Sequence, residues 1–444
     1  MASVPRVNLR TLFQGSLILF PYTAFWGYFG LLIGLFLLLV RTLRTRQAPI
    51  YPAYVPQFLA GVAALMLLSS WVAYDRPEAL TQLGNFWPFF LFFLAILEVF
   101  RTLQHWHQAA LGLVLTSLPL NLISLVEYGL KSPRLPLDWQ QIPWIATLRM
   151  APHKGRAMVF FNHPNTFASY LVLLLGLGLG LLLYQWAHRP PQTPPSHPLT
   201  LWLGLSTFAC LVGIFASGSR NGLLVAVSQV GLFILCSPFS RTLVLGGVGG
   251  LLALLGGALV FGIGGRSLSP SSWLDDPRIG VWRVAWDLIQ ERPWLGWGLG
   301  NYKLVFPPRT FDPVAYANVY HPHNIVLLLA AETGVLVLAL ALLGVGVCCY
   351  RALRVWLTMP RSSAEKSVLL GYLLAFWGCV AYSMLDLTFY DGHINALNWF
   401  LLAGLFWFGK DPGRFSARSP TGDAGDDAPG EGDRPSPPPA QPSA

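Results

Sequence analysis

Charged residues are scarce in this chain: Asp, Glu, Lys and Arg make up 11% of its 444 residues, whereas hydrophobic residues make up 54%. Soluble domains are about 25% charged, so the composition excludes an ordinary soluble protein. The chain also lacks the alternating segments of about ten residues that build an outer-membrane barrel. Its apolar runs instead have the length of spanning helices, roughly 17–25 residues. We therefore predict an all-α polytopic membrane protein.

Cysteine is rare as well, and the five cysteines are odd in number and lack the spacing of metal ligands. All of them fall in or beside apolar runs, which is typical of small buried hydrophobic residues. The glycine-rich turn at 296–300 lacks the GK[ST] of a P-loop. The HPH at 321–323 supplies only two zinc ligands, with no third at a recognisable spacing. We therefore expect no nucleotide P-loop, no metal and no cofactor.

The apolar runs predict twelve spanning helices, at 11–22, 24–41, 55–73, 86–101, 109–130, 164–187, 199–217, 220–237, 242–264, 323–350, 367–387 and 393–409. Cytoplasmic loops carry an excess of Lys and Arg. One such cluster precedes the first helix (Arg6, Arg10) and another follows the second (Arg41, Arg44, Arg46). If both clusters are cytoplasmic, residues 11–41 cross the membrane twice, and both ends of the chain lie inside.

This threading brings the loop at 131–163, the turn at 217–220 and the long loop at 265–322 to the outer face. The two long loops are rich in cations: Lys131, Arg134, Arg149, Lys154, Arg156, Arg266, Arg278, Arg283, Arg292, Lys303 and Arg309. Their charge indicates an anionic partner at the outer leaflet, with ordinary loop solvation as the alternative. The predicted units are 1–154 (first helices and first outer loop), 155–350 (core), 351–410 (last helices) and 411–444, a Pro-, Gly- and Asp-rich tail expected to be disordered.

The stretch SGSRNGLL at 217–224 places a cation at a helix start. Ser219 is positioned to cap the helix that begins at Arg220. Unpaired N–H groups and the helix dipole favour an anion there, and a guanidinium suits phosphate oxygens. The alternative is an arginine that only reaches the membrane interface. Because a helix start repels cations, anion binding is the favoured interpretation of Arg220.

The stretch RIGVWRVAWDLIQERPWLGWGLGNY at 278–302 is too short and too charged to span a membrane. Its helical spacing predicts an interfacial helix with tryptophans at headgroup level, along an apolar stripe of Ile279, Trp282, Trp286 and Ile289. Arg278 stands at the helix start and is a candidate anion ligand. Arg283 is another candidate ligand, with an i,i+4 pair to Asp287 as the alternative.

The stretch YHPHNIVLLLAAETG at 320–334 puts polar residues at the mouth of an apolar helix. Pro322 suits the first helical position, so His323 and Asn324 are expected in the first turn at the outer surface. Glu332 then lies about 12 Å deeper, at 1.5 Å per residue, and is expected to face protein or a water-filled cavity. Histidine titrates near neutral pH, so a general base is one role for His323, and a structural role is the alternative.

A fourth stretch, GRAMVFFNHPNTFASYLVL at 155–173, delivers Arg156, His163 and Asn165 to the outer start of another spanning helix. A capped helix end at Pro164 is the alternative. In order and spacing, HPNTFASYLVL, SGSRNGLL, the R-x-x-x-W of Arg278 and Trp282 leading into ERPWLGWGLGNY, and HNIVLLLAAETG together resemble the O-antigen ligase and polymerase superfamily. The resemblance extends from about residue 155 to 340.

The resemblance implies a GT-C-like fold and a glycosyltransferase of lipopolysaccharide biosynthesis in the bacterial inner membrane. Members take a glycan from undecaprenyl diphosphate and transfer it on the periplasmic face to lipid A–core, another repeat unit or a protein. By this resemblance Arg220 and Arg278 hold the diphosphate, and His323 is the base, with His321 as a second candidate. Arg156, Asn165, Asn324 and Arg283 remain candidate substrate ligands.

The resemblance also implies independence of metal ions, which agrees with the lack of a DxD in the membrane region. No nucleic-acid partner is expected. One alternative is an O-antigen polymerase acting on repeat units. Another is a transporter of bicarbonate or another small anion, because some members of the superfamily are linked to inorganic-carbon uptake. A non-catalytic partner in envelope assembly is the third.

Overall fold

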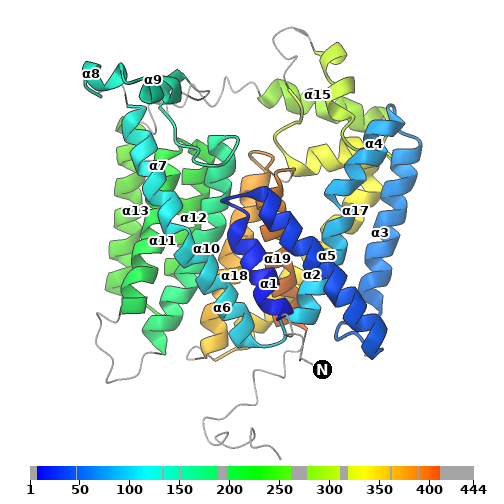
Figure 1. Cartoon of the computed structure of the whole chain (residues 1–444), viewed down its shortest axis with the longest axis horizontal. Coiled ribbons are helices and arrows are strands. Elements are labelled where there is room, and N and C mark those ends of the chain that lie inside the picture. The colour runs from blue at the N-terminus through cyan, green and yellow to red at the C-terminus, as the bar shows by residue number, and fades with distance from the viewer. Residues whose placement is uncertain are drawn as a thin grey trace, which may run out of the picture.

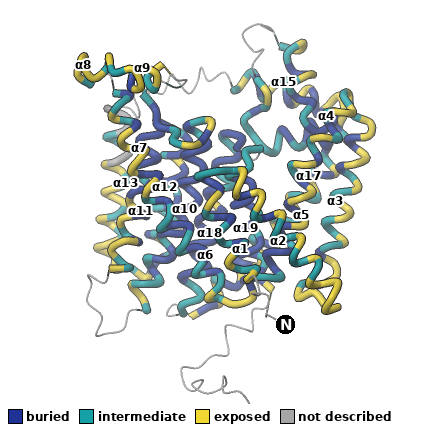
Figure 2. Tube along the Cα trace, in the orientation of Figure 1, coloured by how far each residue is buried: buried dark blue, intermediate teal, exposed yellow. Residues whose placement is uncertain are grey.

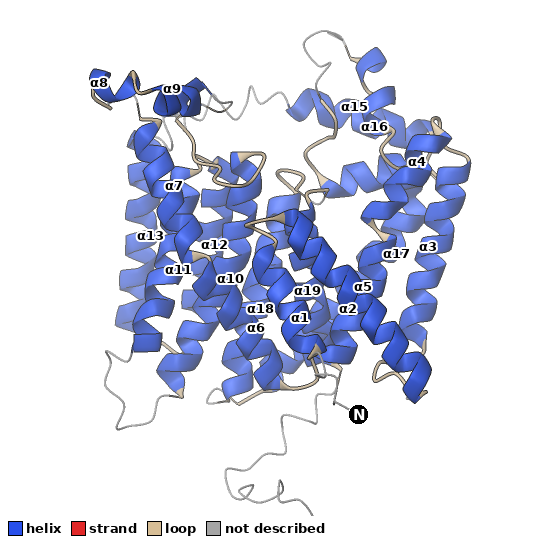
Figure 3. Ribbon diagram, in the orientation of Figure 1, coloured by secondary structure: helices blue, strands red, loops and turns tan. Residues whose placement is uncertain are grey.

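A computed structural model describes residues 8–46, 48–132, 135–150, 153, 155–188, 198–261, 278–310, 319–360, 363–388 and 390–410. Within these ranges the chain consists of helices and loops without any strand (Figure 3). Eight candidate spans in this part of the chain are long and apolar enough to cross a membrane. The prediction of an all-α polytopic membrane protein is confirmed. The tail at 411–444 lies outside the described residues.

Every predicted spanning segment coincides with a helix. These helices are α1 (Leu9–Leu19), α2 (Ala24–Thr45), α3 (Tyr54–Trp71), α5 (Trp87–Val99), α6 (Leu103–Thr116) continued by α7 (Leu118–Leu130), α10 (Pro164–Ala187), α11 (Pro198–Ala216), α12 (Arg220–Cys236), α13 (Arg241–Phe261), α17 (Ile325–Thr358), α18 (Ala364–Ser383) and α19 (Gly392–Gly409). Helix α1 has only 11 residues, about 16 Å at 1.5 Å per residue, which is roughly half of a hydrocarbon core. Twelve crossings therefore stay a prediction.

Several predicted helix boundaries differ from those in the structure, and two of them lie beside the candidate site. Helix α17 begins at Ile325 rather than Pro322, because the Asn324 side chain caps it by accepting hydrogen bonds from the N–H groups of Val326 (2.9 Å) and Leu327 (3.1 Å). Helix α18 ends at Ser383 rather than 387, and the N–H groups of Leu385 and Asp386 after it both donate to the Tyr382 carbonyl. Residues 384–388, which the structure describes, therefore belong to the connection between α18 and α19 rather than to a helix end.

Helix α10 lies inside the bundle and is buried along most of its length (Figure 2). It packs most extensively on α18 and also contacts α11, α6 and α12. Two glycines allow this packing: a methyl group at Gly176 would overlap the backbone of Ala375, and one at Gly180 would overlap that of Gly371. Small residues let helix backbones approach closely in membrane proteins. The α10–α18 pair is therefore a rigid centre, and residues at its ends are well positioned.

The two ends of the bundle differ (Figure 1). One end carries the short helices α4 (Arg76–Gln82), α8 (Leu137–Gln140), α9 (Pro143–Met150), α15 (Arg278–Glu291) and α16 (Tyr302–Val305). The start of α1 lies at the other end, where the Lys410 ammonium donates to the Ile50 carbonyl and Arg351 donates to the Tyr54 hydroxyl. The described parts of the loops expected on the outer face thus lie together, and we call this the loop end.

Helix α15 forms where an interfacial helix is predicted, and the face that it packs against protein differs from the predicted apolar stripe. The helix packs on α17 through Val281, Ala285 and Leu288, with Ile289 also buried. Ile279 and Trp286 are exposed. The packing partner α17 lies on the Val281 side, so it selects a different face from the one that carries the tryptophans.

Helix α17 is broken at Gly334, whose backbone angles (φ 79°, ψ 169°) are not helical. The loop at 293–301 fits into the break. Three backbone hydrogen bonds pair the freed groups: Trp297 N–H to the Ala331 carbonyl (2.9 Å), Gly298 N–H to the Glu332 carbonyl (2.7 Å) and Val335 N–H to the Pro293 carbonyl (2.8 Å). Non-helical backbone at membrane depth is tolerated where protein satisfies it in this way. The break is a joint between α17 and the loop end.

Glu332 lies at this break and is buried. Its carboxylate accepts hydrogen bonds from the backbone N–H of Tyr302 (3.2 Å) and the hydroxyl of Tyr390 (2.9 Å). The expectation that this residue faces the protein interior is confirmed. Because Tyr390 belongs to the segment before α19, Glu332 ties that segment to the joint in α17.

Candidate anion-binding and catalytic site

The segment between α18 and α19 brings a carboxylate to the start of α17. The Nδ1 atom of His323 lies 2.8 Å from Oδ1 of Asp386, and the other oxygen of Asp386 accepts a hydrogen bond from Asn165 Nδ2. Burial by itself raises the pKa of Asp386, but the hydrogen bond and charge of His323, with the charges of His321 and Arg278, outweigh it and hold that pKa below its ordinary value. Asp386 is therefore ionised at neutral pH and can only accept, so His323 donates through Nδ1.

This pairing determines which nitrogen of the His323 ring can accept a proton. A ring whose Nδ1–H is held by a carboxylate carries its lone pair on Nε2. The side chain of His323 is 34% exposed, whereas that of Asp386 is 8% exposed. The backbone of His323 has φ 53°, an uncommon conformation for a residue other than glycine. Such conformations persist where the surroundings hold them and cluster at functional sites.

His321 is arranged differently from its neighbour. The two histidine rings lie edge to face with centroids 4.5 Å apart. The Nδ1 atom of His321 accepts a hydrogen bond from the backbone N–H of His323 at 3.3 Å. Burial lowers the pKa of His321 to about 4, with smaller lowering effects from the charges of His323 and Arg278. His321 is therefore neutral at neutral pH and carries its proton on Nε2, where it is a donor.

Asn165 and Arg156 extend this network to the SGSR turn. Arg156 is buried; its Nη2 donates to Asn165 Oδ1 at 2.6 Å, and its Nε donates to the Ser217 carbonyl at 2.7 Å. The Tyr382 hydroxyl donates to the Asn165 carbonyl at 2.7 Å and lies 3.1 Å from Ser219 Oγ. A continuous set of hydrogen bonds thus joins His323 and Asp386 to the start of α12.

His163 precedes α10 and caps it: its Nδ1 accepts from the Asn165 N–H at 3.0 Å. Its ring lies edge to face with that of His153, with centroids 4.2 Å apart. Burial lowers the pKa of His163 to about 4, followed by the charges of His153 and Arg156. His163 is therefore a second neutral histidine beside the Asp386 carboxylate.

A buried ion pair supports the loop that carries Arg156. Lys131 Nζ lies 2.7 Å from Glu127 Oε1 and donates to the Arg156 carbonyl at 3.1 Å. The second oxygen of Glu127 accepts hydrogen bonds from the N–H groups of Met158 (3.0 Å) and Val159 (2.8 Å). Both charges of the pair are therefore paired and hydrogen-bonded, which is the condition for holding charges in a protein interior.

Arg220 is the first residue of α12, as predicted. Ser219 caps the helix, its Oγ accepting from the Gly222 N–H at 3.2 Å. The arginine side chain is half-buried. Its position at a helix N-terminus, directly after a turn that the Arg156–Ser217 hydrogen bond fixes, combines two features that favour an anion: the positive end of the helix dipole and a guanidinium.

Arg278 approaches the same site from the other side of the loop end. It is the first residue of α15, and one turn further on Trp282 Nε1 donates to the Pro322 carbonyl at 2.8 Å. The indole thus ties α15 to the histidine stretch. The charge of Arg278 lowers the pKa values of both Asp386 and His321. Its guanidinium is therefore within electrostatic reach of both.

Part of the chain that forms this site is similar to a known protein family. Residues 205–342 match the family model described as O-antigen ligase. This stretch is therefore similar to the O-antigen ligase family, and we call it the O-antigen ligase domain. It supports glycosyltransferase activity of the O-antigen ligase or polymerase type, on lipid-linked glycans and glycan acceptors in general. No curated protein matches the chain.

The O-antigen ligase domain contains Arg220, Arg278, His321 and His323, but not every predicted ligand joins them. Asn324 caps α17, and its Nδ2 donates to the Met384 carbonyl at 3.2 Å. Arg283 is exposed on α15, about 140° around the helix from Arg278, and forms no ion pair with Asp287 within this described helix. Asn324 is thus occupied by the fold, and Arg283 lies on a different face of α15 from Arg278.

Arg156 and Asn165 lie before the start of the O-antigen ligase domain, yet hydrogen bonds bring them to it. Their side chains bond to each other and to Ser217 and Asp386, so they hold the site together as well as lining it. Among the residues that the structure describes, no group of three His, Cys, Asp or Glu side chains could hold a metal ion.

Sequence reasoning missed Asp386, His163 as part of the network, and Tyr382. Asp386 lies beyond the O-antigen ligase domain, and the predicted helix at 367–387 enclosed it. The run YSMLDLTFYDGH at 382–393 holds a signal that could have revealed it. Two carboxylates at the edge of a spanning segment are costly to bury, which indicates either a loop or a partner.

Proposed function

We propose that this chain is an inner-membrane glycosyltransferase of the O-antigen ligase type. It moves an oligosaccharide or polysaccharide from undecaprenyl diphosphate to an acceptor hydroxyl. The reaction takes place at the loop end, which we assign to the periplasm, on the side opposite the cationic N-terminal end. The single observation that carries the proposal is the His323–Asp386 pair, in a chain whose O-antigen ligase domain also has an arginine at the start of two of its helices.

The positive charge of the two arginines is complementary to the diphosphate leaving group. When the anomeric carbon–oxygen bond to the diphosphate breaks, negative charge develops on phosphate oxygens. Arg220 and Arg278 each stand at the first residue of a helix, where backbone N–H groups add to the guanidinium. Preorganised positive groups at the position of developing charge stabilise a transition state without reorganisation. We assign the diphosphate to these two residues.

His323 is the residue to which we assign the proton of the attacking hydroxyl. In a single inverting displacement the acceptor oxygen bonds to the anomeric carbon as the diphosphate oxygen departs, and the hydroxyl proton passes to Nε2 of His323. Asp386 stabilises the imidazolium that forms, as a carboxylate does for a catalytic histidine. His321 is the weaker candidate for the base, because its Nδ1 already accepts a hydrogen bond and its Nε2 carries a proton.

Two other functions are less well supported. A polymerase differs from a ligase only in its acceptor and would use the same side chains. An anion transporter would be expected to leave polar groups of a broken helix available to its substrate, whereas the N–H and carbonyl groups at the α17 break are paired with the 293–301 loop. The ligase reaction is therefore the one that we propose.

The test is a transfer assay with purified protein in liposomes. The donor is a glycan on undecaprenyl diphosphate, and lipid A–core and a second donor repeat unit are offered separately as acceptors. The proposal expects a glycosylated acceptor with inverted anomeric configuration by NMR. Flux of labelled bicarbonate into the liposomes with no glycan transfer to either acceptor would contradict it.

A further inference from the structure

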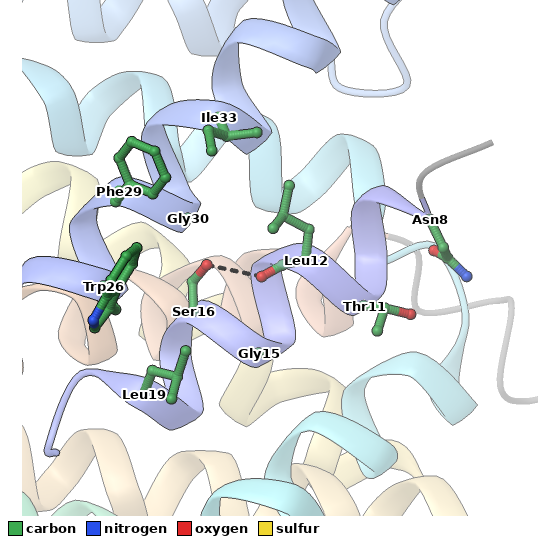
Figure 4. Close-up of a pocket in the computed structure, with 10 residues that line it drawn as sticks. All are labelled: Asn8, Thr11, Leu12, Gly15, Ser16, Leu19, Trp26, Phe29, Gly30 and Ile33. Carbon is green, nitrogen blue, oxygen red and sulfur yellow. Dashed lines mark hydrogen bonds between the residues drawn. The ribbon is translucent and has the colours of Figure 1, made fainter. Parts of the chain in front are cut away.

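A hollow of about 570 Å³ lies between α1 and α2, on the outside of the bundle. Figure 4 shows its lining, which includes Leu12, Ser16 and Leu19 from α1 and Trp26, Phe29 and Ile33 from α2. Its polar side chains are few, and the Ser16 hydroxyl is already used, donating to the Leu12 carbonyl at 2.8 Å. The lining therefore has few hydrogen-bonding partners for a lipid headgroup, and its apolar side chains match an apolar chain.

Glycines shape this hollow. A side chain at Gly30 would overlap the Ser16 hydroxyl, so this glycine lets the two helices approach at that level. A Cβ atom built at Gly15 meets nothing within 4 Å, so the space in front of Gly15 is open. Leu19, Trp26 and Phe29, which also line the hollow, are exposed large apolar residues. The hollow is thus continuous with the surface of α2 that faces lipid.

The turn between α1 and α2 connects the hollow with the candidate site. The Tyr22 ring lies against Phe160, with centroids 6.3 Å apart, and Phe160 follows the loop that carries Arg156. On the other side Tyr28 packs on Gly392, where a methyl group would overlap its hydroxyl. Gly392 begins the helix that follows the Asp386 segment. The turn and the start of α2, next to the hollow, therefore contact both segments that hold the site.

We propose that this hollow binds the head-proximal isoprenoid units of the polyprenyl tail of the donor. The inference rests on the proposed function, because it is the diphosphate at Arg220 and Arg278 that brings a polyprenyl chain to this side of the molecule. An isoprenoid chain leaving that diphosphate toward the bilayer passes the α1–α2 turn and enters a lining of aliphatic and aromatic side chains. We commit to the donor tail rather than to a bulk phospholipid acyl chain as the occupant.

The test fills the hollow. In Gly15→Phe the Cβ meets no protein atom within 4 Å, so the new ring can enter the hollow. A helix-interior glycine is also replaced by a better helix former, which favours retention of the fold. The matched control is Gly61→Phe, in the exposed face of α3, where a Cβ also meets nothing within 4 Å. Both variants and the parent are placed in phosphatidylethanolamine–phosphatidylglycerol nanodiscs. They are irradiated with an undecaprenyl-diphosphate glycan that carries a diazirine in its first isoprene units.

Labelling of α1 and α2 peptides in the parent, competed by unlabelled undecaprenyl diphosphate, is expected. Gly15→Phe should lose this labelling, and its kcat/KM ratio for an undecaprenyl donor over a short-tailed donor should fall about tenfold, since a few apolar contacts are lost. Gly61→Phe should match the parent in both. Labelling that undecaprenyl diphosphate does not compete marks a bulk lipid groove and overturns the inference, as does an unchanged ratio in Gly15→Phe.

The failure of the two proposals can be distinguished. If the parent transfers no glycan from either donor but shows competed labelling at α1 and α2, the proposed function fails and the polyprenyl site stands. If the parent transfers glycan and the labelled peptides come from other helices, the site assignment fails and the function stands.

Discussion

Replacing Asp386 by asparagine isolates the contribution of one carboxylate to the proposed reaction. Asparagine keeps the shape of the side chain and can still accept hydrogen bonds from Asn165 or Leu387, which now bond to Asp386. It loses the negative charge opposite Nδ1 of His323. Its amide can also donate to Nδ1, which moves the imidazole proton to Nε2 and removes the lone pair that a base needs.

The size of the effect follows from the geometry. At the observed 2.8 Å and an effective dielectric constant of about 20, an imidazolium and a carboxylate attract each other by roughly 6 kcal/mol. Because one-third of the His323 side chain is exposed, solvent screening reduces this attraction, and we take roughly half of it, about 3 kcal/mol. That corresponds to a loss of about two powers of ten in rate.

The assay is single-turnover glycan transfer in liposomes at saturating donor, with protein insertion checked by thermal unfolding. The matched control is Asp391→Asn, which makes the same chemical change five residues later. Asp391 caps α19 and contacts His393 rather than His323, and asparagine is an equally good cap, so its rate should stay near that of the parent. An Asp386→Asn protein that folds and transfers glycan at the parent rate would refute the assignment of His323 as a base held by Asp386.

Three further predictions use other parts of the structure. Arg278→Ala should raise the donor KM about tenfold through the loss of charge-assisted hydrogen bonds. The control Arg283→Ala, on the exposed face of α15, should leave the donor KM unchanged. Equal effects of the two substitutions would count against Arg278 as a ligand. Gly334→Ala forces a side chain to φ 79° and should lower the free energy of unfolding by roughly 2 kcal/mol, seen as a lower Tm. Gly346→Ala in the same helix, where a Cβ meets nothing within 4 Å, should leave Tm unchanged or higher, and a similar loss in both would contradict the joint at the break. Burial lowers the pKa of His321 in the folded chain to about 4, below its ordinary 6.5. The unfolded chain therefore binds more protons between these two pH values, and the free energy of unfolding should rise with pH from about 4 to 6.5. His321→Gln should flatten that rise in unfolding curves, and an unchanged slope would contradict a buried neutral His321.

The positions of the spanning helices were predictable because long apolar runs report burial in lipid directly. The ends of these helices were not predictable where a side chain outside the helix determines the residue at which it starts or stops. Pro322 is a good first helical residue, yet the Asn324 cap starts α17 three residues later. The break at Gly334 was equally hidden, because it depends on a loop about forty residues earlier that supplies the missing hydrogen-bond partners.

The candidate site was predictable where chemistry is local to one helix end. Ser219 and Arg220 follow from capping rules and helix dipoles, and both occupy the predicted positions. Asp386 was missed because its pairing with His323 joins residues 63 positions apart, and hydropathy alone placed it inside a helix. The residues of α15 that pack on protein were not predictable for a related reason: periodicity identified apolar residues, but the packing of α17 on Val281 and Ala285 selected the buried ones.

The position of the donor diphosphate is the central claim, and a cryo-electron microscopy structure with a bound donor tests it most directly. The ligand is an undecaprenyl-diphosphate glycan whose anomeric oxygen is replaced by a methylene group, so that it cannot transfer. The account predicts diphosphate density against the guanidiniums of Arg220 and Arg278, with Nε2 of His323 facing the anomeric carbon from the opposite side. Diphosphate density elsewhere on the protein, with these three side chains out of contact with the donor, would contradict it.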